Sequence, residues 1–152
     1  MLLKGISRSD IASRWYAFKR FVPSISNKTK YYLNDLWSLD LKTLKWKCLS
    51  TDPNSSASTT GRQRKGRMLP HPKRRKECAI WLDTQSNELY IHGGQGEEAR
   101  LNDLWKFSLD NKEWVHIQPK NKKHIPIARY GHCGVYQNGY GYIWGGKRLY
   151  IK

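Results

Sequence analysis

The 152-residue sequence contains no run of about 18 apolar residues, so it predicts no transmembrane helix. Its first residues turn polar at Lys4 and lack the roughly 7–15-residue apolar core of a secretory signal. A mitochondrial presequence stays an alternative, because the first 30 residues contain Arg and Ser and a single acidic residue, Asp10. The sequence therefore favours a cytoplasmic protein.

Cysteine is scarce and has no metal-binding or redox spacing. Cys48, Cys78 and Cys133 give an odd count without a CxxC motif, which favours reduced thiols in a reducing compartment. The five histidines show no HxH, HxxxH or HExxH spacing, and no GxGxxG, GxxxxGK[ST] or GxSxG motif occurs. The sequence therefore predicts no catalytic residue, cofactor or metal site, although His92 and His132 are expected to approach each other.

Acidic residues are few: 12 Asp and Glu against 28 Lys and Arg give a net charge of +16. Half of this excess lies in residues 62–76, whose basic residues are Arg62, Arg64, Lys65, Arg67, Lys73, Arg74, Arg75 and Lys76. A solvated loop without a function is one interpretation. The others are a nuclear import signal at 73–76 and a surface for anionic lipid or nucleic acid. No RNA- or DNA-binding motif accompanies the segment, so nucleic acid is the secondary alternative.

One phrase occurs twice, 68 positions apart. Residues 32–46 (YLNDLWSLDLKTLKW) and 100–114 (RLNDLWKFSLDNKEW) are identical at seven of fifteen positions. In both copies apolar and polar residues alternate, which predicts a strand with one buried face and one wet face. A short polar turn then leads to a returning strand at 46–50 or 114–118. Each copy therefore predicts a β-hairpin.

A second pair of segments frames the later copy. ELYIHGG (88–94) and GYGYIWGG (139–146) end in glycine pairs 52 positions apart, and strand-like segments at 77–83 and 132–138 precede them. Four strands in a period of about 50 residues predict an all-β propeller of four-stranded antiparallel blades. Residues 50–75 are polar and lack apolar periodicity, so a basic, disordered insertion between blades is expected there.

The combined pattern resembles a kelch repeat. ELYIHGG followed by LNDLWKFSLDNKEW has an apolar strand, two glycines, an aromatic strand and a Trp at a fixed distance, and residues 129–146 resemble the start of another repeat. The resemblance covers about 31–50 and 76–146, and it implies an incomplete kelch-type β-propeller. The expected parts are an N-terminal segment at 1–30 (a decayed half-blade, or irregular or helical structure), the second half of a blade at 31–50, a linker at 51–75, a complete repeat at 76–118 and the first half of the next repeat at 119–152.

The residues of the repeated motif are expected to be structural. Paired glycines permit backbone conformations and close approaches that a Cβ would block. The Trp residues, Trp144 among them, are expected to fill the spaces between blades, and the Asn-Asp pairs to fix turns through side-chain-to-backbone hydrogen bonds. The predicted structural set is Asn34, Asp35, Trp37, Trp46, Gly93, Gly94, Asn102, Asp103, Trp105, Trp114, Gly145 and Gly146.

The resemblance implies a non-catalytic scaffold or adaptor that binds a protein partner, because loops on a rigid scaffold usually carry recognition. The candidate contact residues are Gln95, Glu97, Glu98, Arg100 and Arg129. A propeller closes with about 4–8 blades, whereas this sequence predicts about two. The alternatives are a piece of a larger propeller, copies that complete one another, blades supplied by another protein, and a truncated product without function.

Overall fold

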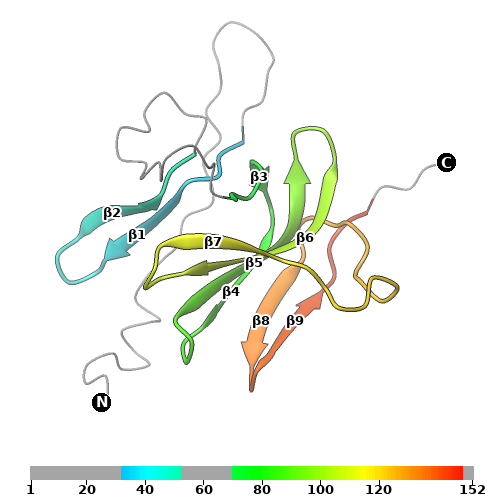
Figure 1. Ribbon diagram of the computed structural model, residues 1–152. Helices are drawn as coiled ribbons and strands as arrows, with labels where there is room; N and C mark the ends of the chain where they lie inside the picture. Colours follow the sequence, from blue (N-terminus) through cyan, green and yellow to red (C-terminus); the bar gives the residue numbers. More distant parts are fainter. Residues whose placement is uncertain (1–31, 53–69, 149–152) are drawn as a thin grey trace, which may run out of the picture.

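The computed structural model describes residues 32–52 and 70–148 (Figure 1). In these residues the chain forms antiparallel β-sheets and no helix, which confirms the predicted all-β class. Accordingly, the described part of the chain has no helix that could cross a membrane.

The central sheet is a four-stranded antiparallel blade. Its strands are β4 (Ala79–Asp83), β5 (Glu88–Gly96), β6 (Arg100–Ser108) and β7 (Glu113–Ile117), and each pairs with the next along the chain. A short fifth strand, β3 (Arg75–Lys76), pairs with the end of β5 beyond the reach of β4. The four-strand order confirms the prediction from the repeat.

A two-stranded hairpin lies on each side of this blade (Figure 1). One hairpin consists of β1 (Leu36–Asp40) and β2 (Lys45–Ser50), the other of β8 (Cys133–Gln137) and β9 (Tyr140–Trp144). By the sequence repeat, β1–β2 corresponds to β6–β7, and β8–β9 corresponds to β4–β5. Each hairpin is therefore half of a blade, as predicted for an incomplete kelch-type propeller.

The hydrophobic core lies between the blade and the β1–β2 hairpin. Strand alternation places the apolar side chains of β5, β6 and β7 on the face toward this hairpin. The buried members of the cluster are Leu36, Leu89, Ile91, Trp105, Phe107 and Trp114. Full burial of one such side chain contributes about 1.5–3 kcal/mol, so these contacts hold β1–β2 against the blade.

The opposite face of the blade packs under the β8–β9 hairpin. The ring of Trp81 in β4 stacks on Tyr90 in β5, with centroids 5.8 Å apart and planes 3° apart. A Cβ at Gly134 or Gly141 would lie 2.7 Å or 2.9 Å from the Trp81 ring. These glycines therefore allow the hairpin to lie directly on the indole.

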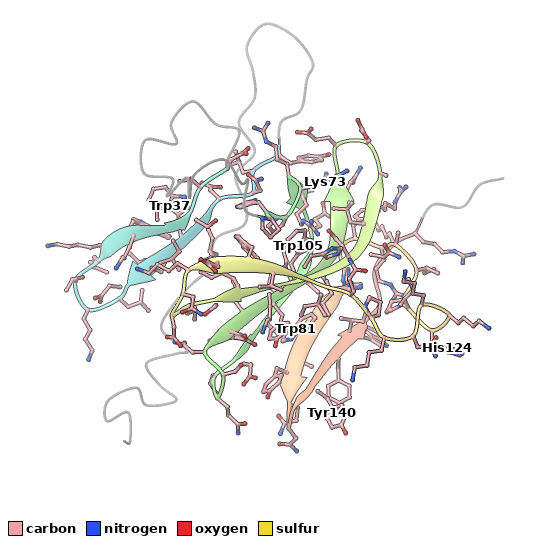
Figure 2. All side chains as sticks on the ribbon, viewed as in Figure 1. Trp37, Lys73, Trp81, Trp105, His124 and Tyr140 are labelled. Carbon is pink, nitrogen blue, oxygen red and sulfur yellow. The ribbon has the colours of Figure 1, made fainter. Side chains whose placement is uncertain are left out.

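The repeated Trp residues, predicted to fill the spaces between blades, are buried in the complete blade and exposed in the two half-blades. Trp105 is 8% exposed and Trp114 is 5% exposed. In contrast, Trp37, Trp46 and Trp144 are 36%, 53% and 81% exposed. The three exposed rings belong to the two hairpins. Figure 2 shows Trp37 of β1 and Tyr140 of β9 at opposite sides of the molecule.

The structure corrects the C-terminal end of the predicted 51–75 linker. Arg75 belongs to β3 and is 1% exposed, because its guanidinium bonds to the neighbouring strands. Arg74 forms an ion pair with Asp52 at 2.6 Å. The last two residues of the predicted linker therefore belong to the folded part of the chain. Other predictions lie outside the described residues, namely the 1–30 segment and the basic residues Arg62, Arg64, Lys65 and Arg67.

Candidate functional site

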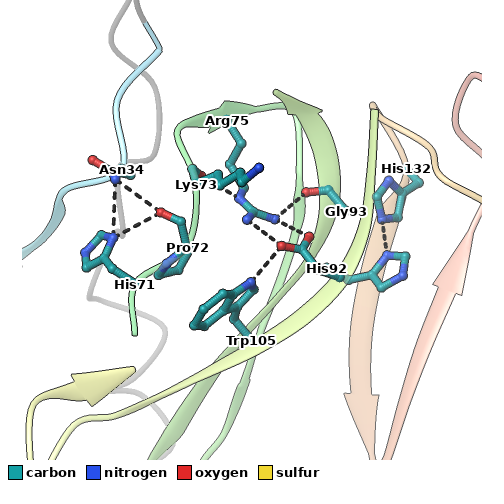
Figure 3. Close-up of polar contacts among 10 residues, drawn as sticks. Asn34, His71, Pro72, Lys73, Arg75, His92, Gly93, Trp105 and His132 are labelled. Carbon is teal, nitrogen blue, oxygen red and sulfur yellow. Dashed lines mark hydrogen bonds and ion pairs between the residues drawn. The ribbon is translucent and has the colours of Figure 1, made fainter. Parts of the chain in front are cut away.

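A buried arginine joins three strands of the blade (Figure 3). Arg75 donates to Asp103 through two parallel hydrogen bonds, Nη1–Oδ1 at 2.6 Å and Nη2–Oδ2 at 2.8 Å. Its Nη1 also donates to the Gly93 carbonyl at 3.0 Å. Burial alone would raise the pKa of Asp103, but the hydrogen bond and charge of Arg75 outweigh it and lower this pKa below its usual value.

The prediction that the Asn-Asp pairs fix turns is wrong. Asp103 lies within β6 and accepts a hydrogen bond from Trp105 Nε1 at 2.7 Å, and Asp35 accepts one from Trp37 Nε1 at 2.6 Å. Asn34 instead donates to the Pro72 carbonyl at 3.1 Å, across 38 positions of sequence. Each Asp thus orients the indole of the Trp two residues later.

Asn102 also lies within β6 and is exposed. Within the described residues, its side chain forms no hydrogen bond. Within the described residues, the second Asn of the repeat therefore has no counterpart to the long-range contact that Asn34 makes with Pro72.

The glycine pairs have positive φ angles, as their predicted role requires. Gly93 and Gly94 have φ of 58° and 103°, and Gly145 and Gly146 have φ of 75° and 89°. A Cβ at Gly93 would lie 2.9 Å from the carbonyl oxygens of both Arg129 and Leu101, so its backbone is tightly enclosed. At Gly145 no atom lies within 4 Å of the corresponding position.

Two buried histidines meet between the blade and the last hairpin. His92 Nδ1 and His132 Nε2 are 2.9 Å apart, which confirms that these residues approach each other. Their second ring nitrogens, Nε2 of His92 and Nδ1 of His132, are buried without a hydrogen-bond partner. Burial lowers both pKa values, that of His92 to about 4, so both rings are neutral near pH 7. Within residues 32–52 and 70–148, no group of three or more His, Cys, Asp or Glu could hold a metal.

The β5–β6 turn places charged side chains at one end of the blade. The Gly96 N–H donates to the Ala99 carbonyl at 2.9 Å and closes a tight turn. Glu97 and Glu98 are exposed at its tip. The guanidinium of Arg74 lies 3.9 Å from the carboxylate of Glu97. We call the set Arg74, Gln95, Glu97, Glu98 and Arg100 the charged rim.

Of the predicted contact residues, four lie on the charged rim and one points elsewhere. Arg100 lies with its guanidinium 5.1 Å from the centroid of the Tyr130 ring. Arg129 is close in the backbone, because its carbonyl accepts from the Gly94 N–H at 2.8 Å. However, the Arg129 guanidinium donates to the Gly145 carbonyl at 3.1 Å. Its part in partner binding stays a prediction.

A groove of about 560 Å³ opens between the blade and the last hairpin. Leu104 of β6, Ile117 of β7 and Ile143 of β9 are among its apolar lining, and Gln118 and residues of the 119–126 connection border it. The groove lies beside β9, which pairs with β8 alone among the described strands.

Part of the basic segment is paired with carboxylates of the fold. Arg75 is buried and bound to Asp103, and Arg74 is bound to Asp52. Lys73 is exposed, and Lys76 lies 3.6 Å from Glu77. Two of the eight basic residues of the segment therefore pair with carboxylates of this chain.

The sequence patterns missed Trp81 and Tyr130, and they assigned Arg75 to the basic segment without its structural role. For Arg75 a signal exists, since an arginine precedes each glycine pair, 18 positions before Gly93 and 16 before Gly145. Trp81 and Tyr130 have no comparable repeat signal.

Comparisons with known proteins point to one family. The model of the Kelch motif matches residues 84–121, which include β5, β6 and β7. The leucine-zipper-like transcriptional regulator 1 homolog of Drosophila melanogaster is 28% identical over 115 residues, which are 74% of this chain and 10% of that protein.

Two further relatives carry comparable identity. Kelch domain-containing protein 10 of Homo sapiens is 29% identical over 119 residues, 78% of this chain and 23% of the relative. Host cell factor 1 of Mus musculus is 30% identical over 135 residues, 79% of this chain and 6% of the relative. The chain thus spans a quarter or less of the length of these relatives. The motif match, these relatives and the blade together show that this chain is a kelch-repeat protein.

Proposed function

We propose that this kelch-repeat chain is a non-catalytic protein-interaction module, a scaffold or adaptor that binds a partner protein through the charged rim. The observation that carries the proposal is the exposed pair Glu97 and Glu98 at the tip of a rigid turn. Charged side chains held on a rigid scaffold can select a complementary surface without a large ordering cost.

The interior of the blade supports this assignment. Arg75, Asp103 and Trp105 bond to one another and hold the strands together. The positive-φ glycines allow the backbones of β5, β6 and the segment near Arg129 to approach closely. Since the repeated residues have structural tasks, specificity is left to the exposed turns.

A charge-reversal experiment tests the rim. The variant Glu97→Lys/Glu98→Lys changes two exposed residues, so the free energy of unfolding should change by less than about 0.5 kcal/mol. We expect it to lose the partners that the unmodified chain captures from cell extract, as identified by mass spectrometry. The matched control, Asp110→Lys/Glu113→Lys, makes the same charge change at the β6–β7 turn. Capture of the same partners by both variants would count against the rim.

We also propose a cytoplasmic location, with nuclear import through the basic segment as the alternative. The supporting feature is the excess of basic residues in 62–76. Fluorescence imaging of the tagged chain tests this, with the six basic residues of 62–76 other than Arg74 and Arg75 replaced by Ala, because Arg74 and Arg75 are paired within the fold. A nuclear signal that persists in this variant would contradict import through these residues.

A further inference from the structure

Complementary halves of one polar network lie next to the two hairpins, at Arg129 before β8 and at Asp35 before β1. In the blade, Arg75 donates from Nη1 to the Gly93 carbonyl and from Nε to the carbonyl two residues earlier, both at 3.0 Å. Arg129 makes the same pair of bonds: Nη1 to the Gly145 carbonyl at 3.1 Å and Nε to the carbonyl two residues earlier at 3.2 Å. Arg129 therefore repeats the geometry of Arg75 beside the second glycine pair.

The carboxylate half of this network is repeated at the other hairpin. In the blade, Asp103 binds the arginine and accepts from Trp105 Nε1 at 2.7 Å. Asp35 accepts from Trp37 Nε1 at 2.6 Å in the same way. Among the described residues, however, neither Asp35 nor Arg129 forms an ion pair with an opposite charge.

The groove is lined by residues equivalent, in the sequence repeat, to those of β1–β2 that pack against the aromatic core. In the β1–β2 hairpin, Leu36 and Leu49 contact that core. Sixty-eight positions later in the sequence, Leu104 and Ile117 line the groove. The exposed face of β6–β7 thus has the apolar positions that, in β1–β2, receive aromatic rings from a neighbouring blade.

The β1–β2 hairpin also repeats the rings that such a surface receives. Trp114 is 5% exposed and donates to Ser50 Oγ across the interface at 3.0 Å. Its equivalent in the first copy of the repeat, Trp46, is 53% exposed. Trp37, the equivalent of the buried Trp105, is 36% exposed. Among the described residues, the groove therefore receives no Trp ring of the repeat, and Trp37 and Trp46 pack into no groove.

We propose that the β1–β2 hairpin of a second copy of this chain occupies the groove and pairs with β9, completing the blade that β8–β9 begin. The register follows from the blade, where Ile91 lies opposite Trp105. By the same register Trp37 of the second copy lies opposite Ile143. This places Asp35 of the second copy beside Arg129, as Asp103 lies beside Arg75.

The proposal predicts a closed head-to-tail ring. In residues 32–52 and 70–148, each copy supplies one complete blade and two half-blades, which together equal two blades. Since propellers close with about 4–8 blades, a ring needs about two to four copies. The expected particle mass is therefore two, three or four times 17.9 kDa. This self-association uses other residues than the charged rim, and it does not depend on the proposed function.

Light scattering on the purified 152-residue chain, across a concentration series, is the first measurement. Arg129→Glu and, separately, Asp35→Arg should each weaken association about 30-fold or more. Each change brings two like charges together, one from each copy, and these repel. The doubly changed chain, Asp35→Arg/Arg129→Glu, restores opposite charges between copies and should restore the ring.

Two further variants separate misfolding from lost association. Trp46→Ser removes an exposed ring, so the circular dichroism spectrum should stay unchanged while the ring dissociates. The rim variant Glu97→Lys/Glu98→Lys should lose partners and keep the ring mass, which distinguishes this inference from the proposed function. The proposal is overturned if the unmodified chain stays monomeric throughout the light-scattering series, up to roughly 100 µM. Association that Arg129→Glu and Trp46→Ser leave unchanged overturns it equally.

Discussion

Arg75 and Asp103 lie 28 positions apart in the sequence and form a two-point ion pair inside the blade, at 2.6 Å and 2.8 Å. The pair connects β3 to β6, which do not pair directly, and a third bond ties it to Gly93 of β5. While both partners are present, a buried ion pair changes the free energy of unfolding little. Removal of one partner is strongly destabilising, because it leaves a buried charge unpaired.

The first prediction concerns this pair. Arg75→Ala should lower the free energy of unfolding by about 3–5 kcal/mol, because it leaves the Asp103 carboxylate without its cation. Chemical denaturation followed by Trp fluorescence measures the change. Lys73→Ala, at an exposed position two residues earlier, is the matched control and should cost less than about 0.5 kcal/mol. Equal costs for the two variants would contradict the structural role of Arg75.

The second prediction concerns the enclosed glycine pair. Gly94→Ala should destabilise the chain by about 2–4 kcal/mol, because it combines a positive φ with a Cβ 2.8 Å from the Lys76 carbonyl. Gly145→Ala also has a positive φ, but its Cβ meets no atom within 4 Å, so about 1 kcal/mol is expected. Thermal unfolding of both variants tests the ranking, and a reversed order would refute it.

The third prediction is a dependence of stability on pH. An unfolded His binds its proton near pH 6.5, whereas burial keeps the folded pKa of His92 at about 4. Between these values the unfolded chain binds more protons, so stability is complete above about pH 6.5 and decreases as the pH falls toward 4. Each such His contributes a slope of up to about 1.4 kcal/mol per pH unit.

Denaturation midpoints at pH 7, 6 and 5 measure that slope. Replacing His92 and His132 by Gln should reduce it, while His71, whose pKa burial also lowers, keeps its own share. An identical slope in the unmodified chain and the double variant would show that the histidine pair does not titrate as expected.

The fourth prediction concerns the attachment of the last hairpin. Trp81→Ala should lower the free energy of unfolding by about 3–5 kcal/mol and loosen β8–β9, because Gly134 and Gly141 rest on the indole. Hydrogen exchange of the β8 and β9 amides should accelerate more than that of β6. Leu44→Ala, in the exposed β1–β2 turn, serves as control. Uniform acceleration over all strands would indicate global destabilisation instead.

The strands could be predicted from the sequence, because alternation fixes which side chains share a face and the repeat shows each unit twice. The structural role of Arg75 was missed despite the arginine ahead of each glycine pair, since a run of basic residues normally indicates a solvated segment. Its burial depends on a carboxylate that another strand supplies 28 positions later. Chain spacing says nothing about such a contact.

The role of Asp103 was within reach of the sequence but was assigned to a turn. Asn and Asp favour turns, and that preference outweighed the strand periodicity around them. Residues i and i+2 of a strand lie on one face, so Asp103 and Trp105 could have been expected to meet, and likewise Asp35 and Trp37.

The ion pair between Asp52 and Arg74 has a consequence for what this position of the chain tolerates. It holds together the two points at which the chain leaves and rejoins the sheets, 2.6 Å apart at the charged atoms. Each doubling of a connection between fixed ends adds only about 0.6 kcal/mol of closure entropy. Sequence of very different length can therefore be accommodated here at small thermodynamic expense, which makes this junction a natural place to graft a tag or a foreign peptide.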